Sequence, residues 1–177
     1  MSSTDGSEPL PQAGEQPPTE GALRAERALA ASGVPYTLTR HGKVGSLREA
    51  ATVRGVDPSA IVKTLVVRRG DDDFLFVLVP GDRTISWPKL RTLLGISRMS
   101  MPDAATAREV TGYERGTITP FGSLRAWPVV ADSRVPGRPV SVGAGAHGVA
   151  ATLDGDDLVR AVDATVADVT EPQPEDA

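Results

Sequence analysis

The chain has 177 residues, a formal net charge of −4 at pH 7 and no cysteine. This length predicts one domain with tails, and the lack of cysteine excludes disulfides, a thiolate nucleophile and a Cys-ligated metal. A hydrophobic fraction of 40% is enough for a core, yet no window approaches the roughly 18 apolar residues of a membrane span. The first residues also lack the basic and apolar regions of a secretory signal. These features fit a cytoplasmic protein that does not use a membrane as a partner.

Acidic residues concentrate at the two ends of the chain. Residues 1–20 and 171–177 contain acids but no Lys or Arg, so all 19 basic residues lie in 21–170, whose own charge is about +3. The ends are rich in Pro, Glu, Gly and Ser, which predicts two disordered tails around one ordered domain at 21–170. A weakly basic body can bind a polyanion, although solvated surface charge is the commoner explanation.

Hydrophobic periodicity and capping residues predict the elements in chain order. They are a helix over 21–33, a strand over 35–41, a helix over 46–55, a helical turn over 57–62, a hairpin of strands over 61–69 and 73–80, helices over 86–95 and 103–112, a loop to 122, strands over 126–132 and 138–145, a helix over 155–162 and a strand over 164–169. Helices and strands mix without strict alternation. The pattern therefore predicts an α/β or α+β domain with a mixed sheet, rather than a doubly wound fold.

Lys63 is the first candidate for chemistry, within the strand sequence "IVKTLVV". Period-two geometry places it on the face of Ile61 and Leu65, while Thr64 lies on the opposite face. Both faces are largely apolar, so the lysine is either buried near a pocket, where desolvation lowers its pKa, or at a strand end where it reaches water. The residues alone favour neither alternative.

The segment "TGYERGTITPFG", residues 111–122, is the second candidate because it holds three glycines and one proline. Gly112, Gly116 and Gly122 allow positive φ and close approach of the backbone, and Pro120 stiffens the exit. Successive N–H groups in such a loop can surround an anion or a developing oxyanion. A plain connector between helix and strand explains the glycines as well, and the loop matches no P-loop or dinucleotide pattern.

The third candidate is "SVGAGAHG", in which Gly143, Gly145 and Gly148 surround His147. It is either a second turn that faces the substrate or the end of a strand. The chain has two histidines, His41 and His147, and no cysteine, which makes a weak case for zinc because a catalytic site typically has three protein ligands. The GxSxG motif of serine hydrolases is absent, and the acidic turns lack EF-hand spacing.

Taken in order, these segments resemble the YbaK/EbsC family of aminoacyl-tRNA deacylases, which are related to the editing domain of prolyl-tRNA synthetase. The resemblance rests on "IVKTLVV", on "TGYERGTITPFG" about fifty residues later, and on "VSVGAGAHG" followed by "LDGDDLVRAVDATVADV". It covers roughly residues 21–170. No single motif is very specific, but the ordered set is.

The resemblance implies a mixed sheet, curled into a partly open barrel and surrounded by helices. It implies hydrolysis, without a metal or another cofactor, of the ester that joins a wrong amino acid to a tRNA. Cys-, Ala- or Ser-tRNA is the expected substrate class, with tRNA-Pro as a candidate carrier. The acceptor end is the expected partner and a synthetase a further candidate, while no oligomeric state is predicted.

The family's functional positions map onto this chain residue by residue. The catalytic candidates are Lys63, Gly116 and Thr117. The candidates for substrate binding are His41, Thr64, Gly112, Pro120, Gly122, Gly143 and Gly145. A charged Lys63 would stabilise the oxyanion or hold a phosphate, and a neutral one would act as a base; the charged role is favoured.

The sequence also departs from relatives that carry a second glycine at Thr117, a tyrosine at His41, and serine, glycine or aspartate around Gly143, Ala144 and Ala150. These departures bear on which substrate is used. They leave three hypotheses in order of preference: a free-standing deacylase, a non-catalytic module that binds the acceptor end or an aminoacyl-tRNA complex, and an interaction domain with a vestigial pocket.

Overall fold

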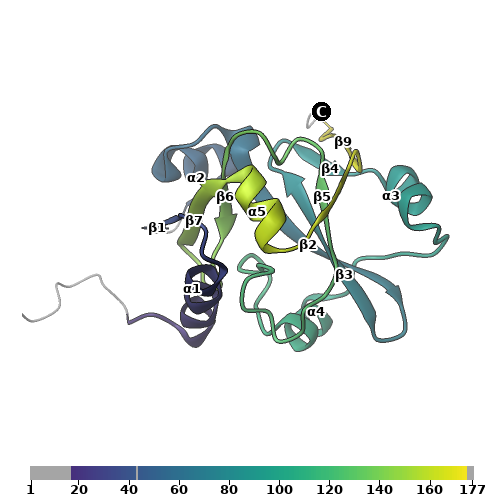
Figure 1. Cartoon of the computed structure of the whole chain (residues 1–177), viewed down its shortest axis with the longest axis horizontal. Coiled ribbons are helices and arrows are strands. Elements are labelled where there is room, and N and C mark those ends of the chain that lie inside the picture. Colours follow the sequence, from purple (N-terminus) through teal and green to yellow (C-terminus); the bar gives the residue numbers. More distant parts are fainter. Residues whose placement is uncertain (1–16, 43, 175–177) are drawn as a thin grey trace, which may run out of the picture.

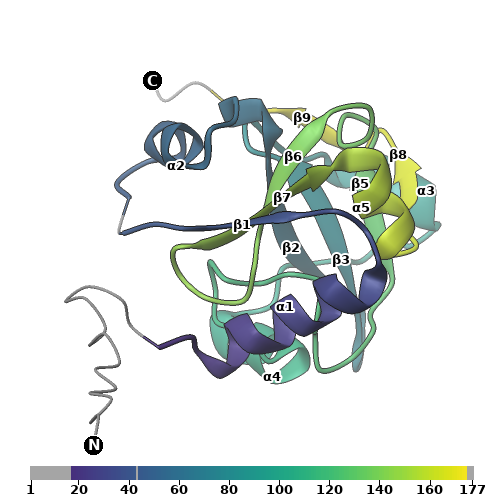
Figure 2. The same cartoon turned by 60° about the vertical axis from the view of Figure 1, so that its left-hand side comes forward.

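A seven-stranded mixed sheet forms the centre of the fold, in the order β1-β7-β6-β2-β3-β5-β8. The computed structural model describes residues 17–42 and 44–174 (Figure 1). The strands are β1 Thr37–Arg40, β2 Ile61–Gly70, β3 Asp73–Pro80, β5 Val129–Asp132, β6 Pro139–Gly143, β7 Val149–Asp154 and β8 Thr165–Ala167, with a separate antiparallel pair of β4 Arg83–Ile85 and β9 Thr170–Pro172. Figure 2 shows β1, β6 and β7 folding over β2 and β3, so the sheet is curled. The expected mixed sheet is confirmed.

Five α-helices and a short 3-10 helix surround the sheet within the described residues. They are α1 Glu20–Ser32, α2 Leu47–Arg54, η1 Pro58–Ala60, α3 Trp87–Leu94, α4 Ala104–Thr111 and α5 Gly155–Ala161. Local chemistry sets their ends: Ser46 Oγ accepts a hydrogen bond from Glu49 N at 3.1 Å, and left-handed glycines end α1 to α4. All the helices predicted from periodicity are present. None of these helices is long and apolar enough to cross a membrane.

The two faces of the sheet pack against different helices. The larger core joins Val62 and Val66 of β2 to buried residues of α1, α4 and α5, such as Leu29 and Leu158. The second core lies on the other face, where Val67 packs with residues of β4 and α3. The helix α2 forms a small third cluster against the start of β2. The strand β2 is therefore covered on both faces, as its sequence predicts.

Three strands in the structure were not predicted, namely β4, β7 and β9. The strand β7 is missed because its residues Val149, Ala150 and Ala151 are all buried, so the sequence lacks the polar–apolar alternation of a half-exposed strand. It pairs with both β1 and β6, so the glycine-rich segment after Gly143 is the loop of a β-hairpin. The elements run from Glu20 to Pro172, slightly beyond the predicted limits of the domain.

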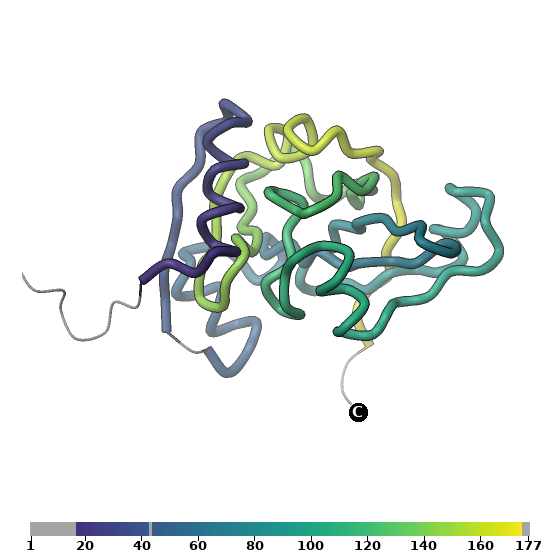
Figure 3. Tube along the Cα trace, turned by 90° about the horizontal axis from the view of Figure 1, so that it is seen from below, coloured from purple at the N-terminus to yellow at the C-terminus, as the bar shows by residue number. Residues whose placement is uncertain are grey.

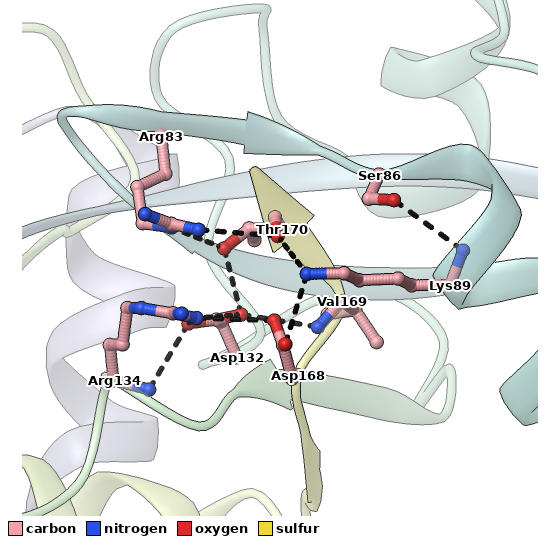
Figure 4. A network of polar contacts seen from close by, with 8 residues as sticks. All are labelled: Arg83, Ser86, Lys89, Asp132, Arg134, Asp168, Val169 and Thr170. Carbon is pink, nitrogen blue, oxygen red and sulfur yellow. Dashed lines mark hydrogen bonds and ion pairs between the residues drawn. The ribbon is translucent and has the colours of Figure 1, made fainter. Parts of the chain in front are cut away.

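A buried carboxylate, Asp132 at the end of β5, ties the C-terminal segment to the sheet (Figure 4). Its oxygens accept hydrogen bonds from Val169 N at 3.2 Å, from Thr170 Oγ1 at 2.8 Å and from Arg134 Nη1 at 3.2 Å. Thr170 Oγ1 in turn accepts from Arg83 Nε at 2.7 Å. Because every group has a partner, this network can remain in the core at a low cost in free energy.

A second branch of the network lies at the surface. Lys89 Nζ donates to Asp168 Oδ2 at 2.9 Å and to Thr170 O at 3.0 Å. Arg134 Nη1 donates to the other carboxylate oxygen of Asp168 at 3.2 Å. Hydrogen bonds from Lys89 and Arg134 hold the pKa of Asp168 below its ordinary value. Because these ion pairs are exposed, they contribute little to the free energy of unfolding, but they help to position the C-terminal segment.

We expect Asp132→Asn to lower the free energy of unfolding by about 3 kcal/mol. The new amide NH2 would face the hydrogen-bond donors of Val169 and Thr170, and Arg134 would lose the charge of this carboxylate. Urea denaturation measures this change. The matched control is Asp156→Asn, an exposed residue of α5 whose replacement should change the value by less than about 0.5 kcal/mol. Equal effects of the two substitutions would contradict a structural role for the network.

Candidate active site

The central opening in the fold is the place where β6 separates from β2. These strands pair in parallel only at Ile61–Ser141 and Val62–Val142, and β6 ends at Gly143 while β2 continues to Gly70. Farther along β2, the next pairing on this side is the bridge from Arg68 to Ser100. Between these two contacts, no strand within residues 17–42 and 44–174 pairs with this edge of β2, which is called the free edge below.

A pocket of about 430 Å³ lies along this free edge. It is lined by Arg54, Ile61, Val62, Lys63, Thr64, Leu65, Val66, Met101, Pro102, Ala104, Ala107, Arg115, Gly116, Ile118 and Gly143. Ile61 O accepts from Gly81 N beyond β3, and Arg68 bonds to Ser100 on the opposite side. Since alternate residues of a strand point their backbone groups to the same edge, the N–H and C=O of Thr64 and Val66 face the pocket.

Lys63 lines the pocket, but its ammonium is held on the far side of the strand. Its Nζ donates to Arg83 O at 2.7 Å, close to Asp82. Burial lowers the pKa of Lys63, and the negative charge of Asp82 partly opposes that effect. Of the two alternatives open for this lysine, the structure shows the half-buried one, next to a pocket. The Arg83 carbonyl fixes the position of the charge.

Thr64 lies on the opposite face from Lys63, and its hydroxyl has no partner in the part of the chain that the structure describes. Its Oγ1 is buried and without a hydrogen bond. A buried polar atom left unpaired costs about 1–3 kcal/mol, and such atoms call for a specific explanation. The residue lines the pocket, although the hydroxyl oxygen itself is not exposed there.

The glycine-rich loop of residues 111–122 packs around a buried tyrosine. Tyr113 is 1% exposed and its hydroxyl donates to Phe121 O at 2.6 Å. Arg24 of α1 lies over the Tyr113 ring, 4.6 Å from its centroid, and donates to the carbonyls of Gly112 at 2.9 Å and Gly122 at 3.0 Å. Gly112 and Gly122 therefore shape the backbone of the loop, and neither lines the pocket.

Two neighbouring residues of this loop, Gly116 and Thr117, have different environments. Gly116 has a φ of 88° and lines the pocket, and its N–H makes no hydrogen bond with another described residue. Thr117 is buried, and its N–H and its hydroxyl both donate to Glu114 O, at 2.9 and 2.8 Å. Gly116 can thus donate to a bound molecule, whereas the donors of Thr117 are already used within the turn.

The remaining predicted residues lie around the pocket at different depths. Gly143 lines it, and an added Cβ there would lie 3.6 Å from Ile118 O, so the position has room. Gly145 instead packs against α1, where the backbone of Gly21 leaves no space for a side chain. Figure 3 shows the turn between β6 and β7 beside the start of α1. Neither Pro120 nor His41 is in the lining. Lys63, Thr64, Gly116 and Gly143 are therefore the predicted residues that the fold brings together.

Arg54 is a residue of the pocket wall that the sequence analysis did not single out. It ends α2, half-buried, and burial lowers the pKa of its guanidinium. A signal was present: Arg54 follows Ala50 and Ala51 at spacings of four and three, so it lies on the same buried face of the helix. His41, which does not line the pocket, accepts a hydrogen bond at Nε2 from Arg54 Nε at 3.4 Å.

No group of three or more His, Asp or Glu residues that could hold a metal ion exists in the described ranges. The lining offers instead the cationic side chains of Arg54 and Arg115 and no acidic one, while the ammonium of Lys63 lies on the far side of β2. With the free N–H groups of Thr64 and Gly116, this arrangement suits a ligand with anionic or carbonyl oxygens.

The comparisons with known proteins agree with this geometry. Residues 41–161 match the sequence profile of the aminoacyl-tRNA editing domain. The chain is 30% identical over 95 residues to the proline–tRNA ligase of Thermoanaerobacter sp. (strain X514), which is 52% of this chain and 16% of that protein. It is 37% identical over 115 residues to the proline–tRNA ligase of Desulfovibrio desulfuricans, which is 65% of this chain and 19% of that protein.

Solved structures share the fold over nearly their whole length. The crystal structure of the hypothetical protein APE2540 matches with a TM-score of 0.76 and 29% identity, over 84% of this chain and 99% of that one. A candidate trans-editing enzyme for prolyl tRNA synthetase matches with a TM-score of 0.78 and 24% identity, over 88% and 99%. The protein is thus of the class of editing domains. The chain belongs to the aminoacyl-tRNA editing domain family.

We expect Thr64→Val to leave the free energy of unfolding unchanged or to raise it by about 1 kcal/mol, because a methyl group replaces an unpaired buried hydroxyl. Urea denaturation measures the change. Thr111→Val is the matched control: that hydroxyl is also buried, but it donates to Ala107 O at 2.7 Å and accepts from Tyr113 N at 3.2 Å. The control should lose about 1 kcal/mol, and a similar loss in Thr64→Val would show that its hydroxyl is satisfied.

Proposed function

We propose that the chain is an aminoacyl-tRNA deacylase that hydrolyses the ester between a wrong amino acid and the 3′ end of a tRNA. The observation that carries the proposal is the pocket on the free edge of β2, where backbone donors and cations meet without an acid. Membership of the editing-domain family supports it. The description of a structural neighbour as a candidate trans-editing enzyme for prolyl tRNA synthetase supports action on a tRNA in trans.

The proposed chemistry is the attack of water on the ester carbonyl. Negative charge develops on the carbonyl oxygen, and in this proposal the N–H groups of Gly116 and Thr64 donate hydrogen bonds to it. The bond to the ribose oxygen then breaks, that oxygen takes a proton, and a free amino acid and an uncharged tRNA leave. Removal of one such donor from an enzyme typically costs about 10²–10³ in rate, so this backbone geometry would supply much of the catalysis.

Lys63 supplies positive charge in this proposal. Its ammonium donates a hydrogen bond to Arg83 O, and this bond favours the charged form of the lysine. Held there, it acts on the developing oxyanion through space, or it turns toward the ester when substrate binds. A charged lysine in a positioning role fits these contacts better than a neutral base does.

The lining restricts the amino acid that the pocket accepts. Val66, Ala107 and Met101 supply apolar surface to the lining, and the cations Arg54 and Arg115 disfavour a positively charged amino acid. A volume of about 430 Å³ has to hold the ribose as well as the aminoacyl group. Small uncharged amino acids such as Cys, Ala and Ser therefore fit best, and the similarity to proline–tRNA ligases favours tRNA-Pro as their carrier.

One observation favours the alternative of a module that binds the acceptor end without turnover. Thr117 offers neither its N–H nor its hydroxyl to the pocket, since both bind Glu114 O. An oxyanion site here has one loop donor, Gly116, rather than two. This alternative predicts binding of aminoacyl-tRNA with no hydrolysis.

A deacylation panel tests the proposal. Purified protein at one stated salt concentration is mixed with Cys-, Ala-, Ser- and Thr-tRNAs, with Lys63→Ala in parallel. We expect hydrolysis of at least one small-amino-acid tRNA and a loss of about 10² or more in the variant. Arg48→Ala, which removes an exposed charge from α2, is the control and should retain the activity. Full activity in Lys63→Ala would disprove the role of the lysine, and no hydrolysis with retained binding would favour the module.

The pH profile distinguishes the two roles of Lys63. Because burial lowers its pKa, a mechanism that needs the ammonium should lose activity as pH rises through that lowered value. A mechanism that needs a neutral base should gain activity over the same range. The measurement is kcat/KM against pH after subtraction of spontaneous ester hydrolysis, with Lys63→Arg as a charge-retaining comparison. Activity in Lys63→Arg would support the charged role.

A further inference from the structure

The guanidinium of Arg54 is only weakly bound at the pocket wall. Its hydrogen bonds are both long: Nε to His41 Nε2 at 3.4 Å and Nη1 to Ser141 Oγ at 3.5 Å. None of the ion pairs among the described residues includes it. A half-buried cation of this kind has given up part of its hydration without gaining a counter-charge.

The neighbours of Arg54 cannot supply that counter-charge. His41 Nδ1 lies 2.8 Å from Gly42 O, an acceptor, so Nδ1 carries the proton and Nε2 is free to accept from Arg54. Neither the imidazole nor the Ser141 hydroxyl carries a negative charge. The site is therefore organised around a guanidinium that has donors left for an anion.

The pocket has two chemically different ends along β2. Arg54 bonds to Ser141, which pairs with Ile61, so the cation lies at the start of the strand. At the other end Ser100 pairs with Arg68, which places Met101 near Val66. These ends are separated by about 16 Å at the rise of a β-strand. Thr64 lies between these ends on β2, and Gly116 lines the same pocket.

We propose that Arg54 binds the backbone phosphate on the 5′ side of the terminal tRNA nucleotide, so that the aminoacyl group points toward Val66 and Met101. The inference rests on the proposed function, because it names the orientation of the substrate in that pocket. In a tRNA end the phosphate and the aminoacyl ester leave the ribose on opposite sides. The pocket has the same order: cation, ester donors, apolar end. A guanidinium can make two parallel hydrogen bonds to a phosphate.

The test compares two small ligands that differ only in the phosphate. Adenosine 5′-methylphosphate carries one negative charge, as the tRNA backbone does, and adenosine carries none. Isothermal titration at low salt gives both dissociation constants for wild type, Arg54→Gln and the control Arg48→Gln, an exposed arginine of the same helix. We expect wild type and control to prefer the phosphate ligand by about tenfold or more, and Arg54→Gln to lose that preference.

Further variants and substrates separate the possible results. Arg54→Lys should retain part of the preference, since it keeps the charge but not the paired donors, and thermal unfolding of each variant checks its fold. An equal preference in wild type and Arg54→Gln would overturn the inference. Loss of hydrolysis in Arg54→Gln confined to Asp- and Glu-tRNA would also overturn it, in favour of a side-chain carboxylate. A wild-type protein that hydrolyses nothing but shows the Arg54-dependent preference would keep this inference and reject the proposed function.

Discussion

The pocket depends on one constraint, the early separation of β6 from β2. Strand β6 turns away after two residue pairs, because Gly143 leads into the β6–β7 hairpin. The N–H and C=O groups of Thr64 and Val66 then have no strand beside them. A free strand edge is normally a liability that proteins cover. Here the glycine-rich loop of residues 111–122 lies opposite the edge of β2 and leaves a cavity between them. The unpaired edge therefore provides both the space for a ligand and backbone donors for it.

The other face of β2 explains how a charge is held beside this cavity. Arg83 connects the two regions: its carbonyl accepts from Lys63 Nζ, and its guanidinium binds Thr170, which donates to the buried Asp132. The position of the Lys63 ammonium is thus linked to the docking of the C-terminal strand β9 on β4 (Figure 4). A change at the C-terminal end, far from the pocket in sequence, can reach the proposed site through these few hydrogen bonds.

Much of the fold was predictable because local chemistry agreed with it. Caps such as Ser46 and the hairpin of β2 and β3 carry their signals within a few residues. The site was less predictable. Gly112 and Gly122 suggested a substrate loop, but glycine content cannot tell a donor from a chain reversal, and their carbonyls instead bind Arg24. Arg54 was missed because an arginine at a helix end is usually solvated, and its burial depends on Ser141, distant in sequence.

Three residues that break the general rules of a folded core lie at the pocket. Thr64 has an unpaired buried hydroxyl, and Arg54 is a half-buried cation without an acid. Gly116 holds a φ of 88° with its N–H pointing to no described partner. Around Asp132, by contrast, the buried polar groups are hydrogen-bonded, although Ser123 Oγ and Arg138 Nε, away from the pocket, are also buried without a partner among the described residues. Each unpaired group lowers the stability of the empty protein, and a ligand that pairs them raises it by mass action. A ligand that pairs these groups would therefore recover on binding part of the free energy that they cost the protein on folding.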